Sequence, residues 1–134
     1  MGKHLKKIIE LTNAPKAIGP YSPVVQGGPF LFISGQLGIF PEKGTLAEGI
    51  VEQTKQALIN LTALLKAANS DCSNVVKTTV FLADINDFSV MNEVYAEFFP
   101  SLPPARSAVQ VAALPRAALV EIEAVALANE GCCD

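Results

Sequence analysis

LPPARSAVQVAALP (residues 102–115) and VEIEAVAL (120–127) are the two segments most informative about the fold and chemistry of this chain. Arg106 follows a double proline at the start of the first predicted strand, and a planar guanidinium can hold a carboxylate through two parallel hydrogen bonds. Glu121 and Glu123 lie within the second, otherwise apolar strand, where a carboxylate is costly unless it has a partner or a task. Together the segments suggest a small anionic substrate and acid–base chemistry without metal or nucleotide.

Residue periodicity predicts the remaining elements. Five strands are expected over residues 6–11, 30–35, 75–83, 106–112 and 119–127. Apolar residues recur at helical spacing over 49–68, and a second helix is expected from Asp87, as its N-cap, to about Phe99. The proline- and glycine-rich segment 14–28 is expected to be a loop or a strand edge. The order β-β-α-β-α-β-β predicts a single α+β domain over 1–134, a mixed sheet with two helices on one face.

The expected faces of these elements predict what each one buries. On the first helix the predicted polar side comprises Glu52, Lys55, Gln56, Asn60 and Lys66. On the second helix the predicted core stripe comprises Phe88, Met91, Tyr95 and Phe98. The last strand is expected to turn Val120, Ile122, Ala124 and Ala126 to one side, and Leu119, Glu121, Glu123, Val125 and Leu127 to the other. Because neither side is freely polar, the open face of the sheet is expected to pack against copies of the chain in a closed homo-oligomer.

Composition supports an oligomer and argues against nucleic acid. Half of the 134 residues are apolar and only 17% are charged, against roughly 25% in typical soluble domains. A chain with so little charge is expected to cover apolar surface at an interface. The net charge of −3 gives no reason to expect a nucleic-acid backbone as the main partner.

The cysteines and the single histidine predict neither a disulfide framework nor a metal site. Cys132 and Cys133 are adjacent and Cys72 is remote, a pattern that suits a reducing compartment. His4 has no cysteine at ligand spacing. No apolar stretch is long enough to cross a membrane, and no targeting segment is recognised. A cytoplasmic protein is therefore expected, with the mitochondrial matrix as the alternative.

Five segments together resemble one family, the reactive intermediate deaminase (Rid) family, and most of all its enamine/imine deaminase A branch. They are AIGPYSP (17–23), FISGQLG (32–38), VVKTTVFLADINDF (75–88), PPARSAVQVAALP (103–115) and VEIEAVAL (120–127). The resemblance implies a chorismate-mutase-like fold and a homotrimer, barrel-like in assembly, with clefts between subunits. It also implies hydrolysis of 2-iminopropanoate and 2-iminobutanoate to 2-keto acids and ammonia, without a cofactor.

The resemblance also implies roles for particular residues. Arg106 matches the family's carboxylate-binding arginine, and Glu121 matches its acidic residue. The family's other binding residues match Tyr21, Ser34, Gly35 and Asn92. Many members have a cysteine two residues after the arginine, whereas this chain has Ala108, which makes thiol-dependent chemistry at that position doubtful.

Each of these residues also has a structural interpretation, and the function has alternatives. Arg106 could be an ion-pair partner of Glu121 or Glu123, and Tyr21 could be a packing residue. Ser34 and Gly35 could simply end a strand, while Asn92 could be a polar residue on a helix face. Relatives in the family have been linked to ribonuclease activity, translation inhibition and chaperone-like holding, and RNA cleavage is kept as the alternative function. A metabolite sensor that binds through Arg106 without turnover is a third.

Overall fold

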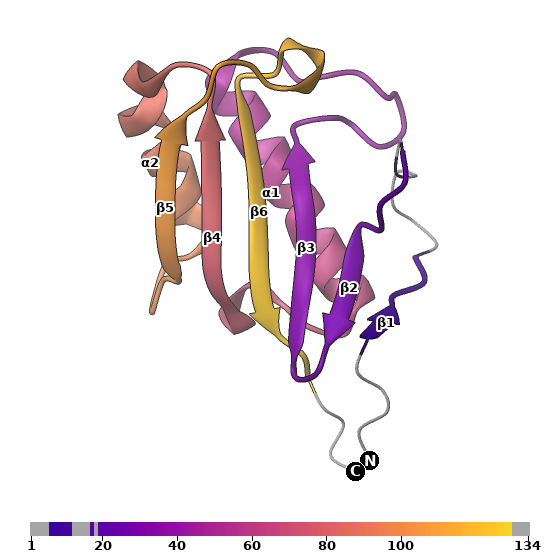
Figure 1. Ribbon diagram of the computed structural model, residues 1–134. Helices are drawn as coiled ribbons and strands as arrows, with labels where there is room; N and C mark the ends of the chain where they lie inside the picture. The colour runs from indigo at the N-terminus through magenta and orange to yellow at the C-terminus, as the bar shows by residue number, and fades with distance from the viewer. Residues whose placement is uncertain (1–5, 12–16, 18, 130–134) are drawn as a thin grey trace.

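The computed structural model describes residues 6–11, 17 and 19–129 (Figure 1). Within these residues the strands are β1 (Lys6–Ile8), β2 (Val24–Gly27), β3 (Phe30–Leu37), β4 (Val75–Leu82), β5 (Ala105–Gln110) and β6 (Val120–Leu127). The helices are α1 (Gly49–Ala67) and α2 (Phe88–Phe98), with short 3₁₀ turns η1 (Cys72–Asn74), η2 (Ile85–Asp87) and η3 (Pro115–Ala117).

The strands form one mixed sheet in the order β1-β2-β3-β6-β4-β5. Every neighbouring pair is antiparallel except β4 and β5, which are parallel because α2 carries the chain back between them. Both helices cover the same face of the sheet, behind it in Figure 1. The predicted α+β architecture is confirmed.

The core lies between α1, α2 and the covered face of the sheet. Alternation along β6 is as predicted, with Val120 and Ile122 fully buried and Glu121 and Glu123 on the open face. Fully buried side chains from α1 and the neighbouring strands complete this layer: Leu58, Leu61, Leu65, Val80 and Leu82. At about 25 cal/mol per Å² of apolar area removed from water, this packing is the main source of stability.

Two polar positions of α1 fix it against the end of β3. The amide of Asn60 donates to the carbonyls of Leu37 and Ile39, at 3.1 and 2.8 Å. A Cβ at Gly38 would collide with the backbone of Gln53, so only glycine permits this close approach. The prediction that Asn60 lies on the exposed side of the helix is therefore wrong, because its amide satisfies two carbonyls in the interior.

Other predicted boundaries need correction. The segment expected to be a loop or strand edge contains β2, which pairs on both sides, with β1 and with β3. Pro23 immediately precedes its first residue, so no ladder hydrogen bond is lost to the proline. Asp87 stands at the N-cap position of α2, but its side chain makes no capping hydrogen bond. Asp84 instead accepts a hydrogen bond from the backbone N–H of Asn86 in the preceding 3₁₀ turn.

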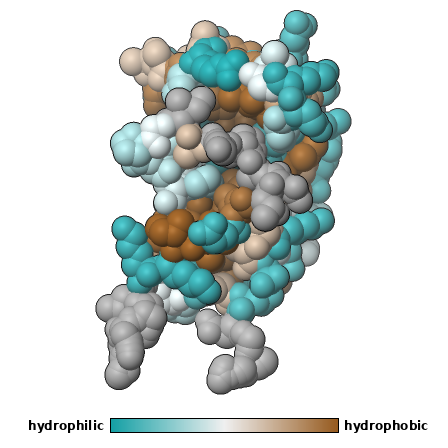
Figure 2. All heavy atoms as spheres, turned by 90° about the vertical axis from the view of Figure 1, so that its right-hand side faces the viewer, coloured by the Kyte–Doolittle hydropathy of each residue, from teal (hydrophilic) through white to brown (hydrophobic). Residues whose placement is uncertain are grey.

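The open face of the sheet carries a continuous row of apolar side chains. The pairing register aligns Ile8, Val25, Phe32 and Val125 in one row across four strands. Phe32 is 47% exposed and Ile8 is 46% exposed in the single chain. Figure 2 shows that apolar surface reaches the β1–β2 side of the molecule, where hydrophilic residues border it. A face of this kind is usually covered by another chain.

Candidate functional site

Four of the predicted site residues lie around one concavity at the open face. Tyr21, Ser34, Gly35 and Glu121 line this hollow, which has a volume of about 760 Å³. Glu123 also borders it. They converge from the loop before β2, the middle of β3 and the start of β6, segments that are far apart in the sequence.

A β-bulge in β3 places two of these residues. Ile33 pairs with Ala124 and Gln36 with Ile122, so β3 has one residue more than β6 between the two pairs, at Ser34 and Gly35. Bulges of this kind re-aim side chains and often lie beside functional sites. The chain then continues as a strand to Leu37, so the predicted end of this strand at Gly35 is wrong.

Gly35 makes room for the carboxylate of Glu121. A Cβ built on Gly35 would come closer to Glu121 Oε2 than real Cβ atoms do, and would lie 2.8 Å from Glu121 Cδ. The backbone of Gly35 does not need a left-handed conformation. Alanine at this position would therefore displace the Glu121 carboxylate, and no turn requires the glycine.

Burial raises the pKa of the Glu121 carboxyl above its ordinary value, and the like charge of nearby Glu123 raises it further. Glu121 is partly buried, whereas Glu123 is exposed on the same face of β6. A raised pKa makes the carboxylate a stronger base, which suits a residue that accepts a proton during catalysis.

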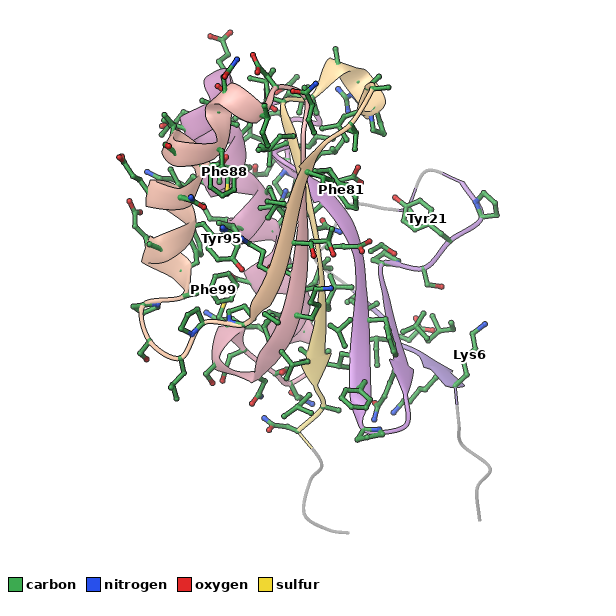
Figure 3. The ribbon with its side chains drawn as sticks, turned by 60° about the vertical axis from the view of Figure 1, so that its left-hand side comes forward. Lys6, Tyr21, Phe81, Phe88, Tyr95 and Phe99 are labelled. Atoms are coloured by element: carbon green, nitrogen blue, oxygen red, sulfur yellow. The ribbon has the colours of Figure 1, made fainter. Side chains whose placement is uncertain are left out.

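Ser34 and Tyr21 lie at the rim, where Ser34 is held by hydrogen bonds and Tyr21 is exposed. The Ser34 hydroxyl donates to the carbonyl of Ser22 at 2.8 Å, and its backbone N–H donates to Pro23 at 2.9 Å. Its hydroxyl oxygen can still accept a hydrogen bond from a ligand. The side chain of Tyr21 is 51% exposed and stands on a loop that projects beyond the sheet in Figure 3. Tyr21 therefore does not pack in the core of its own chain.

Arg106 lies elsewhere, on the covered face beside α2. Its Cζ is 4.8 Å from the ring centroid of Tyr95 and 5.5 Å from that of Phe88. Figure 3 shows both rings between α2 and the sheet. Asn92 lies one helical turn from each ring on the same stripe of α2. Its Oδ1 is buried and has no hydrogen-bond partner in the described part of the chain.

The sheet separates Arg106 from Glu121 within one chain. Thr78 pairs with Arg106 on one side and with buried Ala124 on the other, which places Arg106 on the covered face. Glu121 and Glu123 point to the open face. An ion pair between Arg106 and either glutamate is therefore excluded within one chain. We call Arg106 and Asn92 the arginine half-site, and Tyr21, Ser34, Gly35 and Glu121 the glutamate half-site.

Sequence reasoning missed three contributors to these half-sites. Phe88 and Tyr95 were predicted as core residues only, although their rings contact Arg106. Arg116 lines the same concavity as Glu121 and donates from Nη2 to the carbonyl of Gly44 at 2.9 Å. Arg116 has a left-handed backbone, with φ of 60°, which no local sequence signal indicates.

The other predicted features of the site can be located only in part. Ala108 lies on the covered face of β5, two residues after Arg106, and offers no thiol there. Cys72 is partly buried, and its Sγ is 3.3 Å from the Thr62 hydroxyl. His4, Cys132 and Cys133 lie outside the described residues. Over 6–11, 17 and 19–129, no three metal-ligating side chains gather, and neither helix is long and apolar enough to cross a membrane.

Fold and site together define a small α+β protein suited to acid–base chemistry on an anionic small molecule. Comparison with known proteins identifies its relatives. The family model described as Endoribonuclease L-PSP matches residues 11–128. The chain belongs to this family, which is the Rid family that the sequence segments resemble.

Curated relatives and solved structures agree with this assignment. The chain is 55% identical over 128 residues to the 2-iminobutanoate/2-iminopropanoate deaminase of Mus musculus, which covers 95% of both chains. It is 52% identical to the enzyme of that name from Homo sapiens, covering 95% of this chain and 93% of the relative. E. coli TdcF, crystallised with bound serine, matches with a TM-score of 0.87 and 42% identity, covering 92% of this chain and 99% of TdcF.

Proposed function

We propose that this protein hydrolyses small 2-imino acids, such as 2-iminobutanoate and 2-iminopropanoate, to the corresponding 2-keto acids and ammonia. The observation that carries the proposal is the 55% identity, over nearly the whole of both chains, to a relative that bears this activity in its name. The chemistry of the two half-sites supports it independently, because one can hold a carboxylate and the other can move a proton.

The reaction requires the protein to hold the substrate carboxylate, to bring water to the C=N carbon and to move protons. Arg106 grips the substrate carboxylate with two parallel hydrogen bonds, which fixes the adjacent C=N carbon in space. Water oxygen then bonds to that carbon, and Glu121 takes a proton from the water and delivers it to the nitrogen. Glu121 then carries the hydroxyl proton of the resulting carbinolamine to the nitrogen, the C–N bond breaks, ammonia leaves, and the oxygen remains as the ketone. On this basis Glu121→Gln is expected to lower kcat at least about tenfold.

We further propose that each site is completed by two copies of the chain, in a homotrimer. The arginine half-site of one copy would face the glutamate half-site of its neighbour, because the two half-sites of a single chain lie on opposite faces of the sheet. The exposed apolar row that includes Phe32 and Ile8 supports an interface on the open face.

A coupled assay tests the reaction. A threonine dehydratase generates 2-iminobutanoate in a poorly nucleophilic buffer, and the formation of 2-oxobutanoate is followed with and without the protein. The wild type is expected to accelerate hydrolysis, and Arg106→Ala is expected to abolish the acceleration while the far-UV spectrum stays unchanged. Lys55→Ala, which removes an exposed cation from α1, is the matched control and should keep full activity. A folded wild type that gives no acceleration would refute the proposal.

Mixing two inactive variants tests the shared site. Arg106→Ala chains keep the glutamate half-site and Glu121→Ala chains keep the arginine half-site. In randomly mixed oligomers about a quarter of the sites would combine two intact halves, so about a quarter of wild-type activity should return. If each chain formed its site alone, mixing would restore nothing.

RNA cleavage remains the second candidate because the matching family model is described as an endoribonuclease. The net charge of −3 counts against it, since RNA binding usually requires a basic surface. A titration of single-stranded RNA at rising salt separates the two functions. Phosphate contacts would give an affinity that falls steeply with salt, whereas a deaminase without an RNA role should show no binding at any salt concentration.

A further inference from the structure

The environment of Arg106 contains more than the predicted binding residues. Thr78 pairs with Arg106 across the parallel β4–β5 ladder, so the two side chains leave the same face of the sheet next to each other. Thr78 is fully buried, and its hydroxyl shares a hydrogen bond of 2.7 Å with the Tyr95 hydroxyl. Tyr95 is only 6% exposed, and its ring packs at 4.7 Å from that of Phe99. The ring of Tyr95 is thus held at both its edge and its face.

The guanidinium of Arg106 rests on this immobilised ring. The separation of 4.8 Å lies within the range of a cation–π contact, and Phe88 supplies a second, more distant ring at 5.5 Å. A cation–π contact does not use the guanidinium N–H groups as hydrogen-bond donors, so these remain available for a planar carboxylate. Burial raises the pKa of Tyr95, so the phenol stays neutral and keeps its hydrogen bond with Thr78.

We infer that Tyr95, anchored by Thr78, is a positioning residue that orients Arg106 for the substrate carboxylate. This inference deepens the proposed function and rests on it for the identity of the substrate. A free arginine side chain must lose rotamer freedom when it binds a carboxylate, whereas an arginine held against an aromatic ring has already lost part of it. The contact therefore acts on substrate binding and leaves the proton transfer at Glu121 unaffected.

Three variants test the inference in the coupled assay. Tyr95→Leu removes the ring and is expected to raise KM about tenfold, with kcat changed less than about threefold. Tyr95→Phe keeps the ring but loses the anchor on Thr78, so its KM should rise by less than that of Tyr95→Leu. Phe98→Leu is the matched control, because it removes a partly buried ring from the same helix that has neither the aromatic contact with Tyr95 nor a cation–π contact with Arg106. It should lose stability and leave KM unchanged.

Several outcomes would overturn the inference. A KM that stays at the wild-type value in Tyr95→Leu would do so, and so would an equal rise of KM in Phe98→Leu, which would indicate a purely structural effect. If Tyr95→Leu does not fold, Tyr95→Met replaces it, because the flexible methionine side chain fills the space better without a ring; the same rise of KM is expected, and an unchanged KM there overturns the inference.

A binding measurement keeps this test separate from that of the proposed reaction. The dissociation constant of 2-oxobutanoate, the expected product, is measured by calorimetry for the same variants. If the wild type does not hydrolyse the imine but binds 2-oxobutanoate through Arg106, the proposed reaction is refuted. The inference is then tested by the dissociation constant of Tyr95→Leu alone, and an unchanged constant would overturn it. The expected loss is again about tenfold.

Discussion

Replacement of Gly35 by alanine would test the glutamate half-site most directly. The new Cβ would lie 2.8 Å from Glu121 Cδ and closer still to Oε2, whereas ordinary van der Waals contact begins at 3.4 Å. The carboxylate must therefore move by on the order of 1 Å, and a displacement of that size at a catalytic group can cost about 100-fold in rate. A 100-fold loss corresponds to about 2.7 kcal/mol of activation free energy.

The stability of the Gly35→Ala variant should change little. The colliding atoms belong to the far end of a flexible, partly exposed side chain, and the backbone conformation of Gly35 is open to alanine. We expect the thermal midpoint to stay within a few degrees of the wild type, while kcat/KM in the dehydratase-coupled assay falls between tenfold and 100-fold.

A double-mutant cycle shows whether the loss acts through Glu121. In a Glu121→Ala background the atoms that collide with the new Cβ are absent, so Gly35→Ala should lower the residual rate by less than about twofold. If Gly35→Ala costs the same factor in both backgrounds, the glycine acts through its own backbone or through another neighbour, and the steric reasoning is refuted.

Three further perturbations follow from the same contacts. Burial, and then the charge of Glu123, raises the pKa of Glu121 in the folded state. Between the unfolded and folded pKa values, the native state holds a proton that the unfolded state releases. The free energy of unfolding therefore falls as pH rises through that window. Glu121→Gln should therefore melt above the wild type at pH 7, with the gap closing toward pH 4, and a gap independent of pH would contradict this. Glu123→Gln removes a like charge and should move the Glu121 limb of the kcat profile to lower pH, whereas an unmoved limb would show that burial acts alone. Asn60→Ala leaves the carbonyls of Leu37 and Ile39 without their donor. It should lower the free energy of unfolding in urea by about 2 kcal/mol, and a decrease below about 0.5 kcal/mol would contradict this.

Much of this fold can be predicted from hydrophobic periodicity, because burial follows side-chain direction closely in α1 and β6. The strand that was missed, β2, has only four residues and follows Pro23, so its composition resembles a loop. Asn60 was misplaced because periodicity treats every amide as solvent-facing, whereas two carbonyls at the end of β3 make its burial favourable. Leu37 and Ile39 precede Asn60 by 23 and 21 residues, so no local sequence pattern indicates these hydrogen bonds.

The candidate site could be predicted as a set of residue types but not as a geometry. A glutamate in an apolar strand and an arginine after two prolines are visible in the sequence. Their separation by the sheet depends on strand order and on the parallel β4–β5 register, which a local pattern does not determine. The contact of Gly35 with Glu121 depends on the bulge in β3, whose extra residue shifts the pairing with β6.

The placement of Arg106 and Glu121 on opposite faces has a consequence for heterozygotes that carry one mutated gene copy. If sites form between copies, a chain that lacks Arg106 still lends its Glu121 to a neighbour. In an equal mixture with the wild type it would remove about half of the sites, in proportion to its dose. A chain that lacks both groups inactivates two sites at once, and an equal mixture with the wild type would keep only about a quarter of its sites intact. Two lesions on one allele would thus be more harmful to a heterozygote than either lesion alone, although neither group touches the other within its own chain.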